Sequence, residues 1–219
     1  MKAYIISGLG ANAKAFDKIE FPHNVKKIFL PWIIPNRNEK INEYAKRLSE
    51  NIDDKEPFFL IGLSFGGIVA QEIHQHKKAE KIIIISSIKS ENEKPEYMRF
   101  SERTKLHKLI PTFFLTSDTI ISYSFFRKLH KPKMQDIKSI FEYRNAYYLR
   151  WSINNIVNWK PSWNTLSNLH HIHGDKDKVF PLKYIKNPIT ITNGTHIMIM
   201  QKHKKISQII SEIFNQYKQ

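Results

Sequence analysis

Three side chains that can cooperate in acyl transfer stand far apart in the chain, each after a short apolar segment: Ser64, Asp177 and His196. A serine hydroxyl attacks an acyl carbon when an imidazole removes its proton and a carboxylate holds that imidazole in the correct tautomer. The strands of a parallel sheet end at one edge, so loops that follow such strands can bring distant residues together. The residue types and their positions therefore favour nucleophilic chemistry at Ser64.

Ser64 is the centre of a Gly-x-Ser-x-Gly pentapeptide that runs from Gly62 to Gly66. The apolar run 58–63 before it is typical of a strand buried on both faces. The apolar spacing from Ile68 onwards is typical of a helix with one buried face. A sharp turn between the two requires residues without a Cβ, which the glycines supply. We therefore predict a nucleophile elbow with the Ser64 hydroxyl beside the positive end of a helix; the alternative is an ordinary glycine-rich turn capped by Ser64.

The histidine is better defined by its position than the carboxylate. His196 comes shortly after Gly194, at the end of the last predicted strand, which favours it over the other histidines of the chain. Asp177 shares its turn with Asp175, and Asp118 is a weaker third candidate. The residues alone therefore predict His196 as the base and leave the choice among the aspartates open.

Three further histidines raise the question of a metal site. Alternate residues of a strand face opposite sides, so His171 and His173 share a face that His170 does not. No cysteine or carboxylate completes a ligand set beside them. The loop with Gly8 and Gly10 lacks the third glycine of a dinucleotide fingerprint. We expect neither a metal nor a cofactor.

The elements that would position the candidate residues alternate between strand and helix patterns, which predicts a parallel sheet with right-handed crossovers. Buried strands are predicted at residues 3–6, 25–30, 58–63, 82–87, 169–173 and 189–192. Helices are predicted from about 41 to 52 with Asn38 as the cap, directly after Ser64, and from about 204 to 217.

Between residues 89 and 164 the strand pattern gives way to aromatic-rich stretches with helical spacing, at 97–109, 113–129 and 136–159. This segment is much longer than an ordinary crossover, so we interpret it as a helical lid inserted between two strands. The alternative is ordinary packing of helices on one face of the sheet. Its aromatic residues exceed the needs of one amphipathic face, so some are expected to line a pocket: Phe113, Phe114, Phe125, Phe126, Tyr147, Tyr148 and Trp151.

Composition limits the class of protein. A chain of 219 residues with 41% hydrophobic residues fits one globular domain. The net charge of +15 comes from scattered lysines without a nucleic-acid motif, so we expect a solvated surface and no nucleic-acid partner. Apolar runs of strand length and an N-terminus without a signal pattern predict no stable membrane insertion and a cytoplasmic location. The lack of cysteine excludes disulfides and a thiol nucleophile.

Taken together, these motifs resemble the α/β-hydrolase superfamily over the whole chain apart from the insertion. The resemblance implies Ser64 as the nucleophile, and His-Gly-x-x-Asp from His173 onwards selects Asp177 over Asp175 as the acid. It implies His196 as the base, and backbone N–H groups of Phe65 and Leu9 as the oxyanion hole. The usual His-Gly of the oxyanion loop is replaced here by Ser7-Gly8, and the first two strands of the family are missing. The resemblance therefore implies six parallel strands, in a doubly wound sheet, instead of eight strands.

The expected protein is an α/β-hydrolase with a core of residues 1–88 and 165–219 and a lid of residues 89–164. Its expected activity is that of a serine hydrolase that cleaves a carboxylic ester-type bond through an acyl-enzyme. The same three residues also serve acyltransferases, thioesterases and C–C hydrolases, and a non-catalytic binding protein on this fold is a further alternative. The aromatic insertion favours a small-molecule substrate with an apolar acyl or alcohol moiety. The sequence does not predict an oligomeric state.

Overall fold

The computed structural model describes residues 1–116 and 139–217. A single sheet of six strands runs through it, and all neighbouring strands are parallel, in the order β2-β1-β3-β4-β5-β6. The strands are β1 Lys2–Ile6, β2 Lys26–Phe29, β3 Phe58–Leu63, β4 Lys81–Ile85, β5 Leu169–Gly174 and β6 Ile189–Ile191. The predicted fold class, an α/β protein with a six-stranded parallel sheet and a helical insertion, is confirmed.

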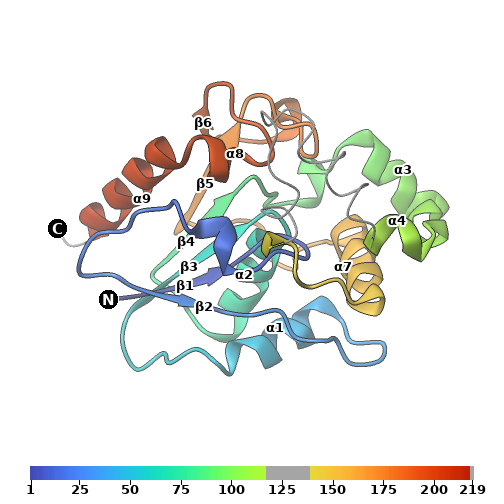
Figure 1. The fold of residues 1–219 in the computed structure, drawn as a ribbon, viewed down its shortest axis with the longest axis horizontal. Helices are drawn as coiled ribbons and strands as arrows, with labels where there is room; N and C mark the ends of the chain where they lie inside the picture. Colours follow the sequence, from blue (N-terminus) through green and yellow to red (C-terminus); the bar gives the residue numbers. More distant parts are fainter. Residues whose placement is uncertain (117–138, 218–219) are drawn as a thin grey trace.

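The helices of the core cover both faces of the sheet (Figure 1). The α-helices of the core are α1 Ile41–Ser49, α2 Phe65–His76, α8 Met198–Gln201 and α9 His203–Tyr217. Short 3-10 helices occur at η1 Ala13–Phe16, η2 Glu91–Glu93, η3 Leu106–Leu109 and η4 Leu182–Tyr184. The α-helices α3 Glu96–Thr104, α4 Thr112–Thr116 and α7 Ala146–Asn158 belong to the insertion.

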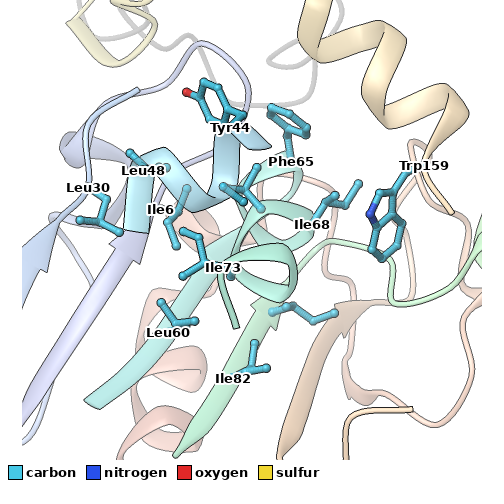
Figure 2. Packing of buried hydrophobic residues seen from close by; sticks show 14 of the residues in the cluster. Ile6, Leu30, Tyr44, Leu48, Leu60, Phe65, Ile68, Ile73, Ile82 and Trp159 are labelled. Atoms are coloured by element: carbon cyan, nitrogen blue, oxygen red, sulfur yellow. The ribbon is translucent and has the colours of Figure 1, made fainter. Parts of the chain in front are cut away.

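The central strand β3 contributes to two hydrophobic cores because its side chains alternate between the faces of the sheet. Phe58 and Leu60 pack with α1 and α2 on one face, whereas Phe59 and Ile61 pack with α9 on the other. Figure 2 shows the first core, in which Leu60, Ile68 and Trp159 lie between the sheet and the helices. Burial on both faces explains why β3 carries an unbroken run of large apolar residues.

Helix α2 differs from its prediction because it is buried on nearly all sides. The sequence indicated one apolar face, but every residue from Phe65 to His74 is buried. The first core also contains residues of α1 and α7, and both helices contact α2 in addition to the sheet. Gln71, one of the buried polar residues, donates through Nε2 to the carbonyl groups of Gly67 and Ile88, whereas its Oε1 has no partner among the described residues.

The predicted cap of α1 is wrong. Asn38 lies in a turn with a φ of 61°, and the N-cap is Lys40. The carboxylate of Glu43 accepts a hydrogen bond from the Lys40 backbone N–H at 2.9 Å, which satisfies one of the free donors at the start of the helix. The helix ends at Ser49, so Ile52 is a buried loop residue instead of a helical one.

The insertion is less helical than its sequence pattern predicts. The predicted stretch 97–109 is divided into α3 and η3, and residues 141–145 of the stretch 136–159 are not helical. In the stretch 113–129, α4 ends at Thr116, and the remainder lies outside the described residues. Phe125 and Phe126 also lie outside them.

Candidate active site

The turn between β3 and α2 holds Ser64 in a backbone conformation that L-residues rarely adopt. Its φ is 52° and its ψ is −117°. A Cβ at Gly62 would overlap the backbone of Gly66, and a Cβ at Gly66 would overlap the backbone of Ser7. The Ser64 backbone is fixed on both sides, because its N–H donates to Ile85 at 2.8 Å and its carbonyl oxygen accepts a hydrogen bond from Ser87 Oγ at 2.7 Å. The strand, the glycine-bounded turn and the helix form the geometry predicted for an elbow.

A chain of hydrogen bonds connects the three residues that the sequence singled out. Ser64 Oγ lies 2.9 Å from His196 Nε2, and His196 Nδ1 lies 2.9 Å from Asp177 Oδ2. The three side chains come from the loops after β3, β5 and β6, which end at the same edge of the sheet. The distances permit proton transfer from Ser64 to His196 while Asp177 holds the Nδ1 proton.

Asp177 is buried and its carboxylate is fully occupied. Its Oδ1 accepts hydrogen bonds from the N–H groups of Val179 at 2.8 Å and Phe180 at 2.9 Å. Burial raises the pKa of Asp177, but the His196 ring, the Phe180 N–H and the nearby His173 outweigh it and hold the pKa below its usual value. The carboxylate is therefore ionised at neutral pH and can stabilise a positive charge on His196.

Asp175, the candidate in the same turn, is not brought to the histidine in the same way. Asp175 Oδ1 is buried and has no hydrogen-bond partner in the described part of the chain. Asp118 lies outside the described residues. The geometry therefore brings Asp177 to His196, as the family resemblance implied.

Two glycines bring the loops of Asp177 and His196 together. Gly174 ends β5 and Gly194 follows β6, and a Cβ at Gly174 would overlap backbone atoms of Gly194. The Lys176 N–H donates to the Gly194 carbonyl at 2.8 Å across the same contact. This close approach of two backbones sets the distance between the carboxylate and the imidazole.

The two amides expected to form an oxyanion hole lie on either side of the elbow. Phe65 is the first residue of α2, and Leu9 lies in the loop after β1. Neither N–H donates a hydrogen bond to the described residues. The indole N–H of Trp32 donates to the Gly8 carbonyl at 3.1 Å, and its ring stacks on Phe65 at 5.4 Å. Trp32 thus connects both sides of the expected hole, a role for which the sequence offered no signal.

A cavity of about 130 Å³, here named the Ser64 pocket, opens beside the hydroxyl. Apart from Ser64 and His196, its described walls are apolar. They include Leu9, Leu63, Met98, Phe141, Ile156 and Phe180. No described charged side chain lines it, so the pocket suits an uncharged apolar group.

The described members of the aromatic set from the insertion do not line the Ser64 pocket. Tyr148 and Trp151 are buried in the first core. Phe113 and Phe114 are exposed, and Tyr147 borders a polar groove away from Ser64. The aromatic residues of this pocket are instead Phe141 and Phe180, which the sequence did not single out. Phe141 lies in the non-helical part of the predicted stretch 136–159, and Phe180 lies in the loop after β5.

A second pair of histidines lies behind Asp177. His171 Nε2 lies 3.2 Å from His173 Nδ1, so the two rings share a face of β5 as predicted. His173 Nε2 lies 2.7 Å from the Phe180 carbonyl and 3.6 Å from Asp177 Oδ2. Because a carbonyl only accepts, Nε2 of His173 carries the proton and Nδ1 accepts from His171. Burial lowers the pKa of both rings and keeps them neutral.

The comparisons with solved structures agree with this topology. A thermophilic esterase from Thermogutta terrifontis superposes with a TM-score of 0.63 and 15% identity, covering 99% of this chain and 90% of that one. A hydrolase from Pseudomonas aeruginosa superposes with a TM-score of 0.67 and 12% identity, covering 97% of this chain and 89% of that one. The 2-hydroxy-6-oxo-6-phenylhexa-2,4-dienoate hydrolase from Rhodococcus superposes with a TM-score of 0.63 and 17% identity, covering 98% of this chain and 90% of that one. The chain has the α/β-hydrolase fold. No family model and no curated protein matches its sequence.

At 12–17% identity the likeness to α/β-hydrolases establishes the fold alone. Among the described residues, no group of histidine and carboxylate side chains is arranged to hold a metal ion. No described helix has the length and apolar character needed to cross a bilayer.

Proposed function

We propose that this α/β-hydrolase-fold protein is a serine hydrolase that cleaves carboxylic ester-type bonds. The observation that carries the proposal is the continuous hydrogen-bonded chain from Ser64 through His196 to Asp177, with an apolar pocket at the hydroxyl. The likeness of the fold to esterases and hydrolases supports the same class of reaction. The substrate is a small molecule with an apolar moiety.

The proposed reaction uses each residue at a stated atom. His196 Nε2 removes the Ser64 proton, and Oγ attacks the ester carbonyl to form a tetrahedral intermediate. Amides of Leu9 and Phe65 receive the oxyanion, and each donor lowers the barrier by about 3 kcal/mol. His196 then gives its proton to the leaving alcohol. Water, activated by the same nitrogen, releases the acid from Ser64.

We extend the proposal to the domain organisation, with residues 1–88 and 165–219 as the catalytic core and residues 89–164 as a lid. Met98 and Ile156 of the insertion line the Ser64 pocket, which supports a role in covering the substrate. A cytoplasmic location remains a prediction from the sequence.

The proposal is tested with the Ser64→Ala variant. We expect this variant to lose hydrolysis of p-nitrophenyl butyrate and covalent labelling by a fluorophosphonate, because it removes the hydroxyl that lies 2.9 Å from His196 Nε2. The matched control is Ser49→Ala, which removes a buried hydroxyl in α1 outside the pocket lining. Hydrolysis that persists in Ser64→Ala at the rate of the control would refute the proposal.

A further inference from the structure

A second apolar depression lies in the insertion, between α3, η3 and α7. This depression, here named the insertion groove, has a volume of about 360 Å³. Its walls include Tyr97, Leu106, Ile110, Ile153 and Val157. The side chains of Tyr97 and Leu106 at its rim are 53% and 47% exposed, so the groove presents apolar surface to solvent.

The insertion groove is adjacent to the Ser64 pocket. Met98 and Ile156 line both cavities, so these two side chains are the wall that the cavities share. Met98 is buried, and its unbranched thioether side chain changes rotamer at low cost. Tyr97 extends the connection, because its hydroxyl donates at 2.7 Å to the carbonyl of Val179, another residue of the Ser64 pocket.

The polar groups of the groove already have partners. His107 Nδ1 lies 3.2 Å from Ser101 Oγ and 3.1 Å from the Ser101 carbonyl. His107 Nε2 lies 3.1 Å from Asn154 Oδ1. No charged side chain of the described residues lines the groove. Its chemistry therefore matches a hydrocarbon chain rather than a polar or ionic ligand.

We propose that the insertion groove binds the distal part of a long unbranched acyl chain whose carbonyl carbon lies at Ser64. This inference rests on the proposed function and names its substrate class as esters of long-chain fatty acids. A cavity of about 150 Å³ holds a ring the size of benzene, so the Ser64 pocket is filled by a short acyl chain. A longer chain displaces Met98 and continues along Ile156 into the groove.

The test compares kcat/KM for p-nitrophenyl dodecanoate and p-nitrophenyl butyrate. Burial of one methylene contributes about 0.8 kcal/mol, which corresponds to about fourfold in kcat/KM. The Ile153→Phe variant narrows the groove without changing the wall of the Ser64 pocket. If two or three methylenes lose their contacts in this variant, the ratio of kcat/KM for the dodecanoate to kcat/KM for the butyrate falls about 16- to 60-fold. Met98→Ala opens the shared wall and should raise the same ratio.

The matched control is Ile34→Phe, which adds the same ring to an exposed isoleucine that lines neither cavity. A ratio in Ile153→Phe equal to that of the control would overturn the proposal. So would a wild-type preference that ends at butyrate, or a change of oligomeric state in Ile153→Phe, which would identify the groove as a self-association surface.

Binding without chemistry separates this inference from the proposed function. Decanol is titrated calorimetrically into the Ser64→Ala protein with and without Ile153→Phe. If Ile153→Phe weakens decanol binding by about tenfold or more, the groove binds the hydrocarbon chain. This result holds even if the wild-type protein hydrolyses no ester, in which case only the proposed function fails. Equal binding by both proteins rejects the groove whatever the hydrolase assay shows.

Discussion

The Asp177→Asn substitution tests the proposed chemistry most directly, because the structure determines how the new amide must lie. Two backbone N–H groups, from Val179 and Phe180, point at Oδ1. An asparagine keeps these hydrogen bonds only if its carbonyl oxygen takes the Oδ1 position. Its NH₂ group then replaces Oδ2, which faces His196 Nδ1 at 2.9 Å and His173 Nε2 at 3.6 Å.

An NH₂ group at that position is a hydrogen-bond donor. His196 Nδ1 can accept this hydrogen bond only if it carries no proton. The imidazole proton must then reside on Nε2, the atom that faces Ser64 Oγ at 2.9 Å. In this tautomer His196 cannot remove the serine proton. Loss of the correct tautomer in a Ser-His-Asp arrangement lowers kcat about 10⁴-fold, which corresponds to about 5.5 kcal/mol in the activation barrier.

The assay is the initial rate of p-nitrophenyl butyrate hydrolysis, with thermal unfolding measured in parallel to show that the variant is folded. Asp175→Asn is the matched control, because it makes the same change in the same turn without a hydrogen bond to His196. We expect the control to stay within about threefold of the wild type, as is usual for substitutions outside the reacting groups. A folded Asp177→Asn protein that retains more than about a tenth of wild-type kcat would refute the assigned role.

The remaining predictions concern the supports of the site and the pH dependence of stability. His173→Phe removes the N–H that lies 3.6 Å from Asp177 Oδ2, so it should lower kcat about 10- to 100-fold with little change in KM, and His173→Gln, which keeps an N–H donor, should recover part of the loss. Gly174→Ala should lower the melting temperature sharply because its Cβ would overlap the Gly194 backbone, whereas Gly8→Ala should be tolerated, since its Cβ has only ordinary contacts. Burial lowers the pKa of His74 to about 4, so between about pH 6.5 and pH 4 the unfolded chain binds a proton that the folded protein does not bind. Urea titrations should therefore show about 2 kcal/mol of stability lost to His74 from pH 7 to pH 5, and less loss in His74→Gln.

The sequence predicted the sheet well because its strands carry an unambiguous signal. The runs in β3 and β4 are short, apolar and followed by turn residues, and burial on both faces requires that pattern. The elbow was equally accessible, since Gly62 and Gly66 are required by backbone contacts that any strand–turn–helix of this kind must make. The parallel direction of the strands followed from the alternation of strand and helix patterns, whereas their order, β2-β1-β3-β4-β5-β6, comes from the structure.

The insertion was less predictable because its helices are short and their contacts are not local. Residues 141–145 have helical spacing in the sequence, but the structure uses them to approach the core: the Tyr143 N–H donates to the Gly10 carbonyl at 3.0 Å. Phe141 thereby lines the Ser64 pocket. Trp32 was equally hidden, since its contacts with Gly8 and Phe65 depend on the fold and not on neighbours in sequence. Periodicity reports which face is apolar and not which cavity it borders.

The strain at Ser64 explains why so much of the surrounding structure is devoted to one turn. A non-glycine residue in such a conformation costs about 1 to 3 kcal/mol, and Ser86, at the end of the next strand, adds a φ of 49°. The hydrogen bonds from Ser64 to Ile85 and from Ser87 to Ser64 tie the two turns together, so neither can relax without breaking the contact between β3 and β4. A serine that served only as a helix cap would accept a hydrogen bond at its side chain, but Ser64 makes none to the helix. The strained backbone therefore supports a chemical role for the hydroxyl and argues against a purely structural one.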